Sequence, residues 1–98
     1  MEASDFPAVE RDFAFIVDAA ITADQLVRAA KSVDRALIER ADVFDVYEGK
    51  SVPEGKKSLA IAVRLQSKDR TLTDAEIESI GQKVIAAVAK GAGGILRT

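Results

Sequence analysis

A hairpin-like stretch, residues 43 to 65, constrains this chain most, because it contains two alternating segments separated by a long polar loop. The later segment carries apolar side chains at every second position, namely Leu59, Ile61, Val63 and Leu65. In the earlier segment, Phe44 and Val46 alternate with polar residues in the same way. A period of two is typical of strands with one buried face. We therefore predict a β-hairpin whose apolar face, including Phe44, is covered by helices.

The other face of the predicted hairpin carries small and polar side chains, which are Asp45, Tyr47, Ser58, Ala60, Ala62 and Arg64. This set is too polar for burial, and it has too few charges to serve only as a hydrated surface. We interpret this side of the sheet, called the open face below, as the functional surface. The loop at residues 48 to 57 is longer than most hairpin loops, which favours a functional role.

The length and composition indicate one ordinary globular domain. Of 98 residues, 48% are hydrophobic and 31% are charged, with no repeat or low-complexity tract. We expect residues 6–98 to form this domain and residues 1–5 to be a flexible start. The sequence has no apolar run of the ~18 residues that a membrane helix needs, and no signal peptide pattern. These features predict a cytoplasmic protein.

Residue types that carry most enzyme chemistry are absent. The chain has no cysteine and no histidine, which excludes thiolate chemistry and removes the commonest metal ligand. It also lacks a glycine-rich phosphate loop and a GxSxG motif. We therefore predict no catalytic residue, no cofactor site and no metal site in this chain. The net charge of −2 argues against general nucleic-acid binding, so any RNA contact must come from a local patch.

The first half of the chain predicts a strand followed by a helix. Phe13, Phe15 and Val17 alternate with less apolar residues, which favours a strand with the phenylalanines in the core. Thr22 and Gln25 have the spacing of a capping box, so a helix is expected to begin after Thr22. The end of this helix is left open, because residues 36 to 41 fit either a continued helix or an early second strand.

The second half predicts a strand over residues 58 to 66 and then the clearest helix signal in the chain. Thr73 and Glu76 have capping-box spacing, and Leu72 and Ile77 are placed as a hydrophobic staple around them. Gly91 is expected to end this helix in a left-handed conformation. A short last strand follows at residues 95 to 97.

The element order, strand–helix–strand–strand–helix–strand, is the ferredoxin-like βαββαβ pattern. This α+β fold has a four-stranded antiparallel sheet in the order 4-1-3-2. Right-handed crossovers place both helices on one face of the sheet and leave the other face open. On that face we expect three central alanines surrounded by polar side chains, including Arg97.

Five segments resemble a known family in order and spacing. They are FPAVERDFAF at 6–15, FDVYEG at 44–49, PEGKKSLA at 53–60, RTLTDAE at 70–76 and ILR at 95–97. Together they are similar to the C-terminal ferredoxin-fold anticodon-binding domain of the β subunit of bacterial phenylalanyl-tRNA synthetases, and the resemblance covers nearly the whole chain.

The resemblance implies a tRNA-binding domain of a larger class II aminoacyl-tRNA synthetase. The partners would be the phenylalanine tRNA and, in the parent enzyme, the α subunit of an α2β2 tetramer; neither DNA nor a membrane is implied. ATP and magnesium would be used elsewhere in the enzyme, because the class II catalytic motifs are absent from this chain. Its short length and abrupt start favour a C-terminal piece of a longer protein.

The resemblance also implies which residues contact RNA. The positions that match the RNA-contacting positions of the family are Ala14, Asp45, Tyr47 and Ser58. Basic residues around them are candidates for phosphate binding: Arg11, Lys56, Lys57, Arg64 and Arg97, with Lys50 in the same group. An aromatic ring can stack on an unpaired base, while carboxylate and hydroxyl groups can bind a base edge.

Simpler interpretations stay open for these residues. Tyr47 also fits an ordinary surface residue, and Asp45 fits a charge that prevents edge-to-edge strand pairing. At the level of function, the alternative is a ferredoxin-like interaction or small-molecule sensing module that dimerises through its sheet. A stable dimer that ignores tRNA would favour that alternative.

Overall fold

The computed structural model describes residues 6–97, so the expected flexible start at residues 1–5 lies outside the described residues. In chain order, the elements are β1 Val9–Asp18, α1 Ala23–Lys31, β2 Ile38–Tyr47, β3 Lys56–Leu65, α2 Asp74–Ala92 and β4 Ile95–Leu96. The strands form one sheet in the order β2-β3-β1-β4, and their pairings are antiparallel. This is the predicted 4-1-3-2 order counted from the other edge. The ferredoxin-like fold is therefore confirmed.

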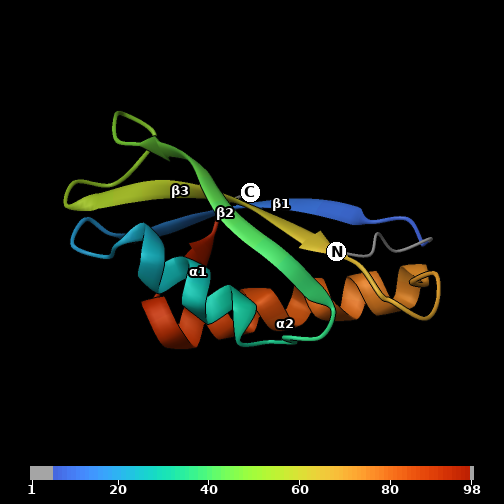
Figure 1. The fold of residues 1–98 in the computed structure, drawn as a ribbon. Coiled ribbons are helices and arrows are strands. Elements are labelled where there is room, and N and C mark those ends of the chain that lie inside the picture. The colour runs from blue at the N-terminus through green and yellow to red at the C-terminus, as the bar shows by residue number, and fades with distance from the viewer. Residues whose placement is uncertain (1–5, 98) are drawn as a thin grey trace.

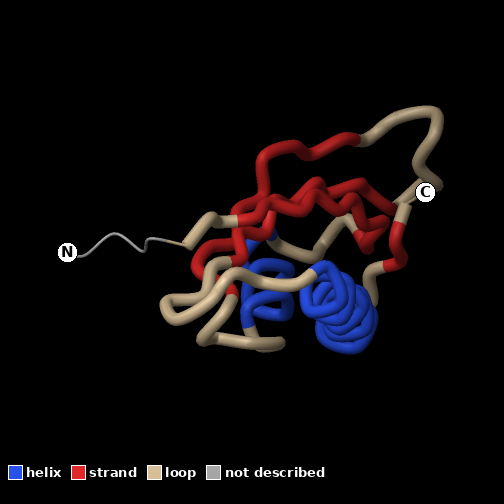
Figure 2. The backbone as a smooth tube through the Cα atoms, turned by 90° about the vertical axis from the view of Figure 1, so that its right-hand side faces the viewer, coloured by secondary structure: helices blue, strands red, loops and turns tan. Residues whose placement is uncertain are grey.

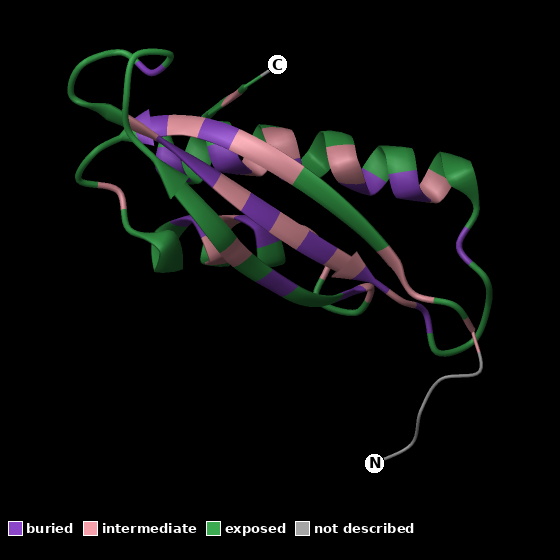
Figure 3. Ribbon diagram, turned by 90° about the horizontal axis from the view of Figure 1, so that it is seen from above, coloured by how far each residue is buried: buried purple, intermediate pink, exposed green. Residues whose placement is uncertain are grey.

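Both helices lie against one face of the sheet (Figures 1 and 2). The central strand β3 alternates between side chains buried under the helices and partly exposed ones, which is visible along its ribbon in Figure 3. Its buried side chains meet those of β1 and α2, so that Phe15, Ile61 and Val84 are fully buried. Phe13 is partly buried against this core. The placement of both phenylalanines in or against the core was predicted correctly.

Both predicted capping boxes are present. At α1, the Thr22 hydroxyl accepts a hydrogen bond of 3.1 Å from the backbone N–H of Gln25. At α2, the Thr73 hydroxyl accepts an equally long bond from the N–H of Glu76. The residues of the predicted staple on either side of Thr73 are buried, each with 6% exposure. Local sequence therefore determines where both helices begin.

The predicted end of α2 at Gly91 is wrong, because the helix continues to Ala92 and ends at Gly93. Gly93 has φ of 65°, the left-handed conformation that glycine adopts without a steric penalty. Ala92 is buried, so one more residue of the helix contributes to the core. Gly91 has a packing role instead, since a Cβ atom there would lie 3.2 Å from Cβ of Ala29 on α1.

The open question between α1 and β2 is resolved in favour of an early strand. Helix α1 ends at Lys31, and β2 begins at Ile38. Between them the Asp34 carboxylate accepts hydrogen bonds from the backbone N–H groups of Ala36 and Leu37, at 3.1 and 3.0 Å. A side chain that binds the following backbone in this way stabilises a turn at the expense of a continued helix.

Strand β2 differs from the prediction because its pairing with β3 contains two register shifts, one between Ile38 and Arg40 and one between Val43 and Asp45. The second shift leaves Phe44 as an extra residue, since Val43 pairs with Ile61 and Asp45 with Ala60. Such a β-bulge breaks the strict alternation of faces. The prediction that Phe44 belongs to the core is therefore wrong, and its side chain is 59% exposed.

Candidate functional site

The four residues that match the RNA-contacting positions of the family lie in two adjacent rows across the sheet. In one row, Asp45 pairs with Ala60, which in turn pairs with Ala14. In the next row, Tyr47 pairs with Ser58. These rows come from β1, β2 and β3, and alternate residues of a strand point to the same face. The structure therefore brings all four together on the open face.

Tyr47 is 41% exposed, and its ring is in contact with Arg97. The guanidinium carbon of Arg97 lies 5.5 Å from the ring centroid, within the range of a cation–π contact. The same guanidinium donates a hydrogen bond of 2.8 Å to the Ser51 hydroxyl in the β2–β3 loop. The backbone N–H of Arg97 donates a hydrogen bond of 2.7 Å to the carbonyl of Ala14. Arg97 thus connects the end of the chain to the loop across the open face.

Gly49 limits the position of the Tyr47 ring. A Cβ atom at Gly49 would lie 2.5 Å from the Tyr47 hydroxyl oxygen, which is closer than nonbonded atoms approach. Only glycine therefore fits there without displacing the ring. The loop is itself folded, because Val52 is buried and its N–H donates to the carbonyl of Gly49 at 3.0 Å. Sequence reasoning assigned this loop a functional role but did not identify Gly49 as the support of Tyr47.

Ser58 is buried, with 4% exposure, although it has the strand position of an open-face residue. Strands β2 and β4 lie on opposite sides of the β3–β1 pair. The contact between Tyr47 and Arg97 therefore spans the two central strands, from the row of Ser58 to the row of Ala14, whose carbonyl accepts a hydrogen bond from the Arg97 backbone. Ser58 pairs with Tyr47 on one side of this span.

Two of the six basic candidates lie on the helix side of the sheet rather than on the open face. Arg11 pairs with Val63, and Lys57 pairs with Val17, so both have the alternation of core residues. Arg11 also lines a small space beside Ile80 of α2. Strand parity therefore places these two candidates on the opposite side of the sheet from the four RNA-contacting positions.

Two other basic candidates are already paired with carboxylates. Arg64 contacts Glu39 at 2.9 Å and Glu10 at 3.7 Å, and Lys56 contacts Asp18 at 2.5 Å. These pairs are exposed, so each contributes little to stability, but each reduces the positive charge offered to a ligand. Lys50 is exposed in the β2–β3 loop. Arg97 is the basic candidate that contacts Tyr47, as described above.

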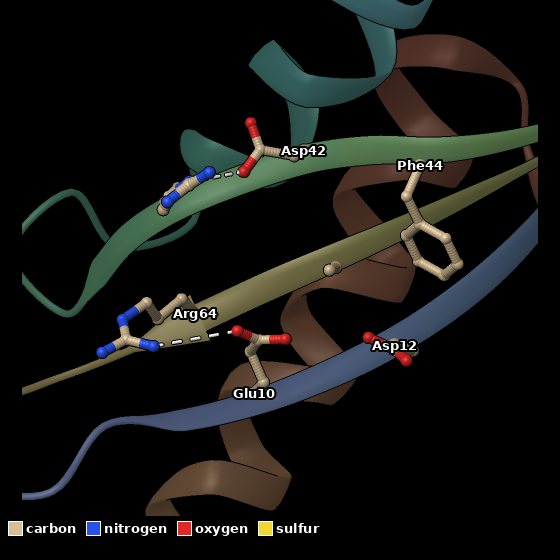
Figure 4. A pocket seen from close by; sticks show the side chains of 7 residues that line it. Glu10, Asp12, Asp42, Phe44 and Arg64 are labelled. Atoms are coloured by element: carbon tan, nitrogen blue, oxygen red, sulfur yellow. Dashed lines mark hydrogen bonds and ion pairs between the residues drawn. The ribbon is translucent and has the colours of Figure 1, made fainter.

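A hollow of about 420 Å³ lies further along the open face (Figure 4). Seven residues line it, which are Glu10, Asp12, Arg40, Asp42, Phe44, Ala62 and Arg64. In Figure 4 the Phe44 ring extends from β2 over β3, toward the side of the hollow where Asp12 lies on β1. Sequence reasoning did not identify this hollow, because it depends on the bulge that exposes Phe44.

The described groups with shifted pKa values lie away from the open face, at the start of α2. Hydrogen bonding to Arg70 lowers the pKa of the Glu76 carboxyl below its usual value, and the backbone N–H of Thr73 acts in the same direction. The Ser67 hydroxyl lowers the pKa of Asp69, with Arg70 contributing further. These groups stabilise a helix start and are not arranged around a cavity.

Within residues 6–97, no group of three or more acidic, histidine or cysteine side chains is arranged to bind a metal, and no helix there suits a membrane span.

Comparisons with known proteins give matches over nearly the whole chain. The family profile described as "ferredoxin-fold anticodon binding domain" matches residues 4–97. The chain is 56% identical over 97 residues to the phenylalanine–tRNA ligase β subunit of Bradyrhizobium diazoefficiens. The matched segment covers 99% of this chain and 12% of the relative. The corresponding subunit of Paramagnetospirillum magneticum is 53% identical over the same shares. That of Brucella abortus is 49% identical over 94% of this chain and 11% of the relative. The chain thus spans about an eighth of the length of these curated relatives.

Proposed function

This chain belongs to the ferredoxin-fold anticodon-binding family, and we propose that it is the tRNA-binding domain of a phenylalanine–tRNA ligase β subunit. It holds the anticodon end of the phenylalanine tRNA on the open face while aminoacylation occurs elsewhere in the enzyme. The observation that carries the proposal is the arrangement of Ala14, Asp45, Tyr47 and Ser58 in two adjacent rows of that face.

The chemistry of these rows suits an unpaired base. The Tyr47 ring offers a stacking surface, and Ala14 and Ala60 form a shallow floor that lets a base approach the sheet. The Asp45 carboxylate makes no hydrogen bond or ion pair within residues 6–97, so it can accept hydrogen bonds from a base edge. The Arg97 guanidinium lies over the Tyr47 ring, so a base that stacks on this ring displaces the guanidinium. The displaced cation can then contact phosphate.

The larger enzyme supplies the remaining functions in this proposal. The α subunit of an α2β2 tetramer is the protein partner, and ATP and magnesium act in domains outside this chain. A cytoplasmic location follows from the same assignment. The chain itself contributes no catalytic group and acts by binding and positioning the tRNA.

The charges predict a modest, salt-dependent contribution to tRNA binding. Arg64 and Lys56 are paired with carboxylates, and the net charge of the chain is −2. Few cations are therefore available for phosphate. The affinity should fall with salt at a log–log slope of about −0.7 for each phosphate that the domain neutralises. Tight binding of unrelated RNA at high salt would contradict this assignment.

The decisive experiment replaces Tyr47 in the full-length ligase and measures tRNA affinity and aminoacylation. Tyr47→Ala should weaken tRNA binding by ~1–3 kcal/mol, because a stacking surface is lost. Tyr47→Phe retains the ring and should bind nearly normally. Val46→Ala is a matched control, because Val46 is on the same strand and 55% exposed but pairs with the core residue Leu59. Equal affinity for wild type and Tyr47→Ala would overturn the proposal.

The edges of the sheet argue against the alternative of a module that dimerises by strand pairing. Strand β4 at one edge has only two residues, and β2 at the other edge contains two register shifts. Short edges and bulges both hinder pairing with a second chain. Measurement of the mass in solution tests this point directly, since a stable dimer indifferent to tRNA would support the alternative.

A further inference from the structure

We infer that the hollow beside Phe44 is a second base-binding position, which takes an unpaired base that carries an exocyclic amino group. This inference rests on the proposed function and extends it to residues outside the four matched positions. The Phe44 ring would stack on the base, and the Asp12 carboxylate would accept a hydrogen bond from the amino group. Guanine, adenine and cytosine have such a group, whereas uracil does not.

The bulge in β2 is the first observation that supports this site. It places an extra residue between Val43 and Asp45, and that residue is an aromatic side chain left 59% exposed on the open face. A single exposed apolar residue is common on protein surfaces, so the exposure of Phe44 supports a site only because its ring also lines the hollow. In the RNA-recognition motif, which also has a four-stranded sheet, aromatic side chains of the sheet stack on two or three bases. Phe44 gives this open face a second aromatic ring on the same strand as Tyr47.

The pairing of the strands makes the two positions continuous. Moving along the open face, the row of Tyr47 is followed by the row of Asp45 and Ala60, and then by the row of Asp42, Ala62 and Asp12. Phe44 lies between the last two rows. The rings are three residues apart on β2, so the two positions are separated by roughly 10 Å of strand. A single strand of RNA can therefore place two of its bases on this surface.

The charges of the hollow select a base edge rather than a phosphate. Its lining contains three carboxylates and two guanidinium groups. Arg40 is paired with Asp42 at 2.7 Å and Arg64 with Glu10 at 3.7 Å, so both cations are already engaged. The Asp12 carboxylate makes no hydrogen bond or ion pair with any other described residue. A phosphate would be repelled here, whereas an amino group provides the hydrogen that a carboxylate accepts.

The size and floor of the hollow are suited to a flat ligand. Its volume of about 420 Å³ lies within the range of roughly 300–1,000 Å³ that is common for small-molecule sites. Ala62 on the central strand β3 is part of its lining, so the side chain that the hollow meets on this strand is small. The Phe44 ring forms one wall and leaves the side toward Asp12 open, as Figure 4 shows.

The test uses the full-length ligase and transcripts of the phenylalanine tRNA in which single unpaired anticodon-loop nucleotides are abasic. Phe44→Ala should raise the Kd of the intact tRNA about 5- to 150-fold, which is the usual loss for one stacked base. Phe44→Leu should lose nearly as much, because it retains apolar bulk without an aromatic face. Val46→Ala should leave Kd within twofold of wild type. At one abasic position, Phe44→Ala should have no further effect, because the base that it binds is already missing.

A second measurement tests the role of the carboxylate. Asp12→Ala removes both acceptor oxygens and should weaken binding several-fold when the base concerned carries its amino group. The effect should disappear with a base analogue that lacks this group at the same position. An equal effect of Asp12→Ala on both transcripts would overturn the assignment of Asp12.

The outcomes separate this inference from the proposed function. If Tyr47→Ala weakens binding and Phe44→Ala does not, the second position is wrong and the anticodon-binding role stands. If neither variant changes Kd, the proposed function fails. If Phe44→Ala leaves Kd unchanged but impairs assembly of the subunits, the hollow binds a protein segment, which also overturns the inference.

Discussion

Strands β2 and β3 are equally long and pair along most of their length, but they differ in regularity. Strand β3 is central, and its large apolar residues Leu59, Ile61, Val63 and Leu65 are buried under the helices. Strand β2 is an edge strand with two register shifts, and its last four residues are exposed. The regular strand forms the core, whereas the irregular strand supplies both aromatic side chains of the open face.

This difference shows how one sheet can combine a stable core with an adaptable surface. A central strand is held on both sides, so a change in its register would move all its apolar residues out of the core. An edge strand is held on one side only and tolerates an extra residue. The bulge at Phe44 therefore adds an exposed ring without disturbing the pairing of β3 with β1.

The largest expected difference between the two strands concerns stability. Ile61→Ala should lower the free energy of unfolding by ~2–5 kcal/mol, because it removes a fully buried side chain. Phe44→Ala should change it by only about 0.5 kcal/mol, as is usual for an exposed position. Denaturant unfolding of both variants checks this. A loss at Phe44 as large as that at Ile61 would mean that the ring is part of the core.

A deletion tests whether the bulge is an independent addition to β2. Val43 pairs with Ile61, and Asp45 pairs with Ala60. Removal of Phe44 would make these two pairs consecutive, as in a regular antiparallel ladder. The shortened chain should therefore fold, with a loss of roughly 0.5–3 kcal/mol. Cross-strand NMR contacts between Asp45 and Ala60 would show the retained pairing. Loss of these contacts would show that the bulge sets the register.

The regular elements of the fold were predictable from the sequence, whereas the irregular strand β2 was predictable only in part. The α2 start was predicted from the four-residue pattern at Thr73 and Glu76, because capping depends on neighbouring residues. The faces of β3 were predicted from its strict alternation, which burial under the helices enforces. The early start of β2 could not be predicted, since helix and strand were both compatible with residues 36 to 41. There, the Asp34 turn decides the outcome.

The candidate site was predictable only in part. The resemblance and the alternation of β3 placed four residues on one face, and the pairing of the strands brings them together. Phe44 was misplaced, because an apolar residue in an alternating segment looks the same whether or not a bulge follows Val43. The contacts of Tyr47 with Gly49 and Arg97 were also missed. They depend on how a loop and the end of the chain fold back over the sheet.

A smaller effect is expected where β2 leads into its loop. Gly49→Ala should displace the Tyr47 ring, because the new Cβ would overlap its hydroxyl, while stability should change by less than ~1 kcal/mol. Tyr47 is the only tyrosine and the chain has no tryptophan, so intrinsic fluorescence reports on this ring alone. Gly81→Ala on α2 is a suitable control, since its Cβ would meet Phe13 at an ordinary 3.7 Å. Unchanged fluorescence in Gly49→Ala would contradict the proposed support of the ring.

The smallest expected effect concerns the turn between β3 and α2. There, a substitution can separate the charge of Glu76 from its part in the capping box. The pKa of Glu76 is lowered by Arg70 and by the backbone at Thr73, so its ionised form is favoured in the folded state. The resulting stabilisation is present above the usual glutamate pKa of about 4.5 and is lost as the pH falls through the lower folded-state value. Glu76→Gln keeps an oxygen for the capping box but removes the charge. This variant should therefore be slightly less stable than wild type at pH 7, and the difference should vanish in acid.

Glu39→Gln on β2 is the matched control, because it breaks an exposed pair with Arg64 and changes no helix cap. Unfolding free energies measured between pH 7 and pH 3 test this, and a deficit of Glu76→Gln that persists at the lowest pH would show that its cause is not the charge.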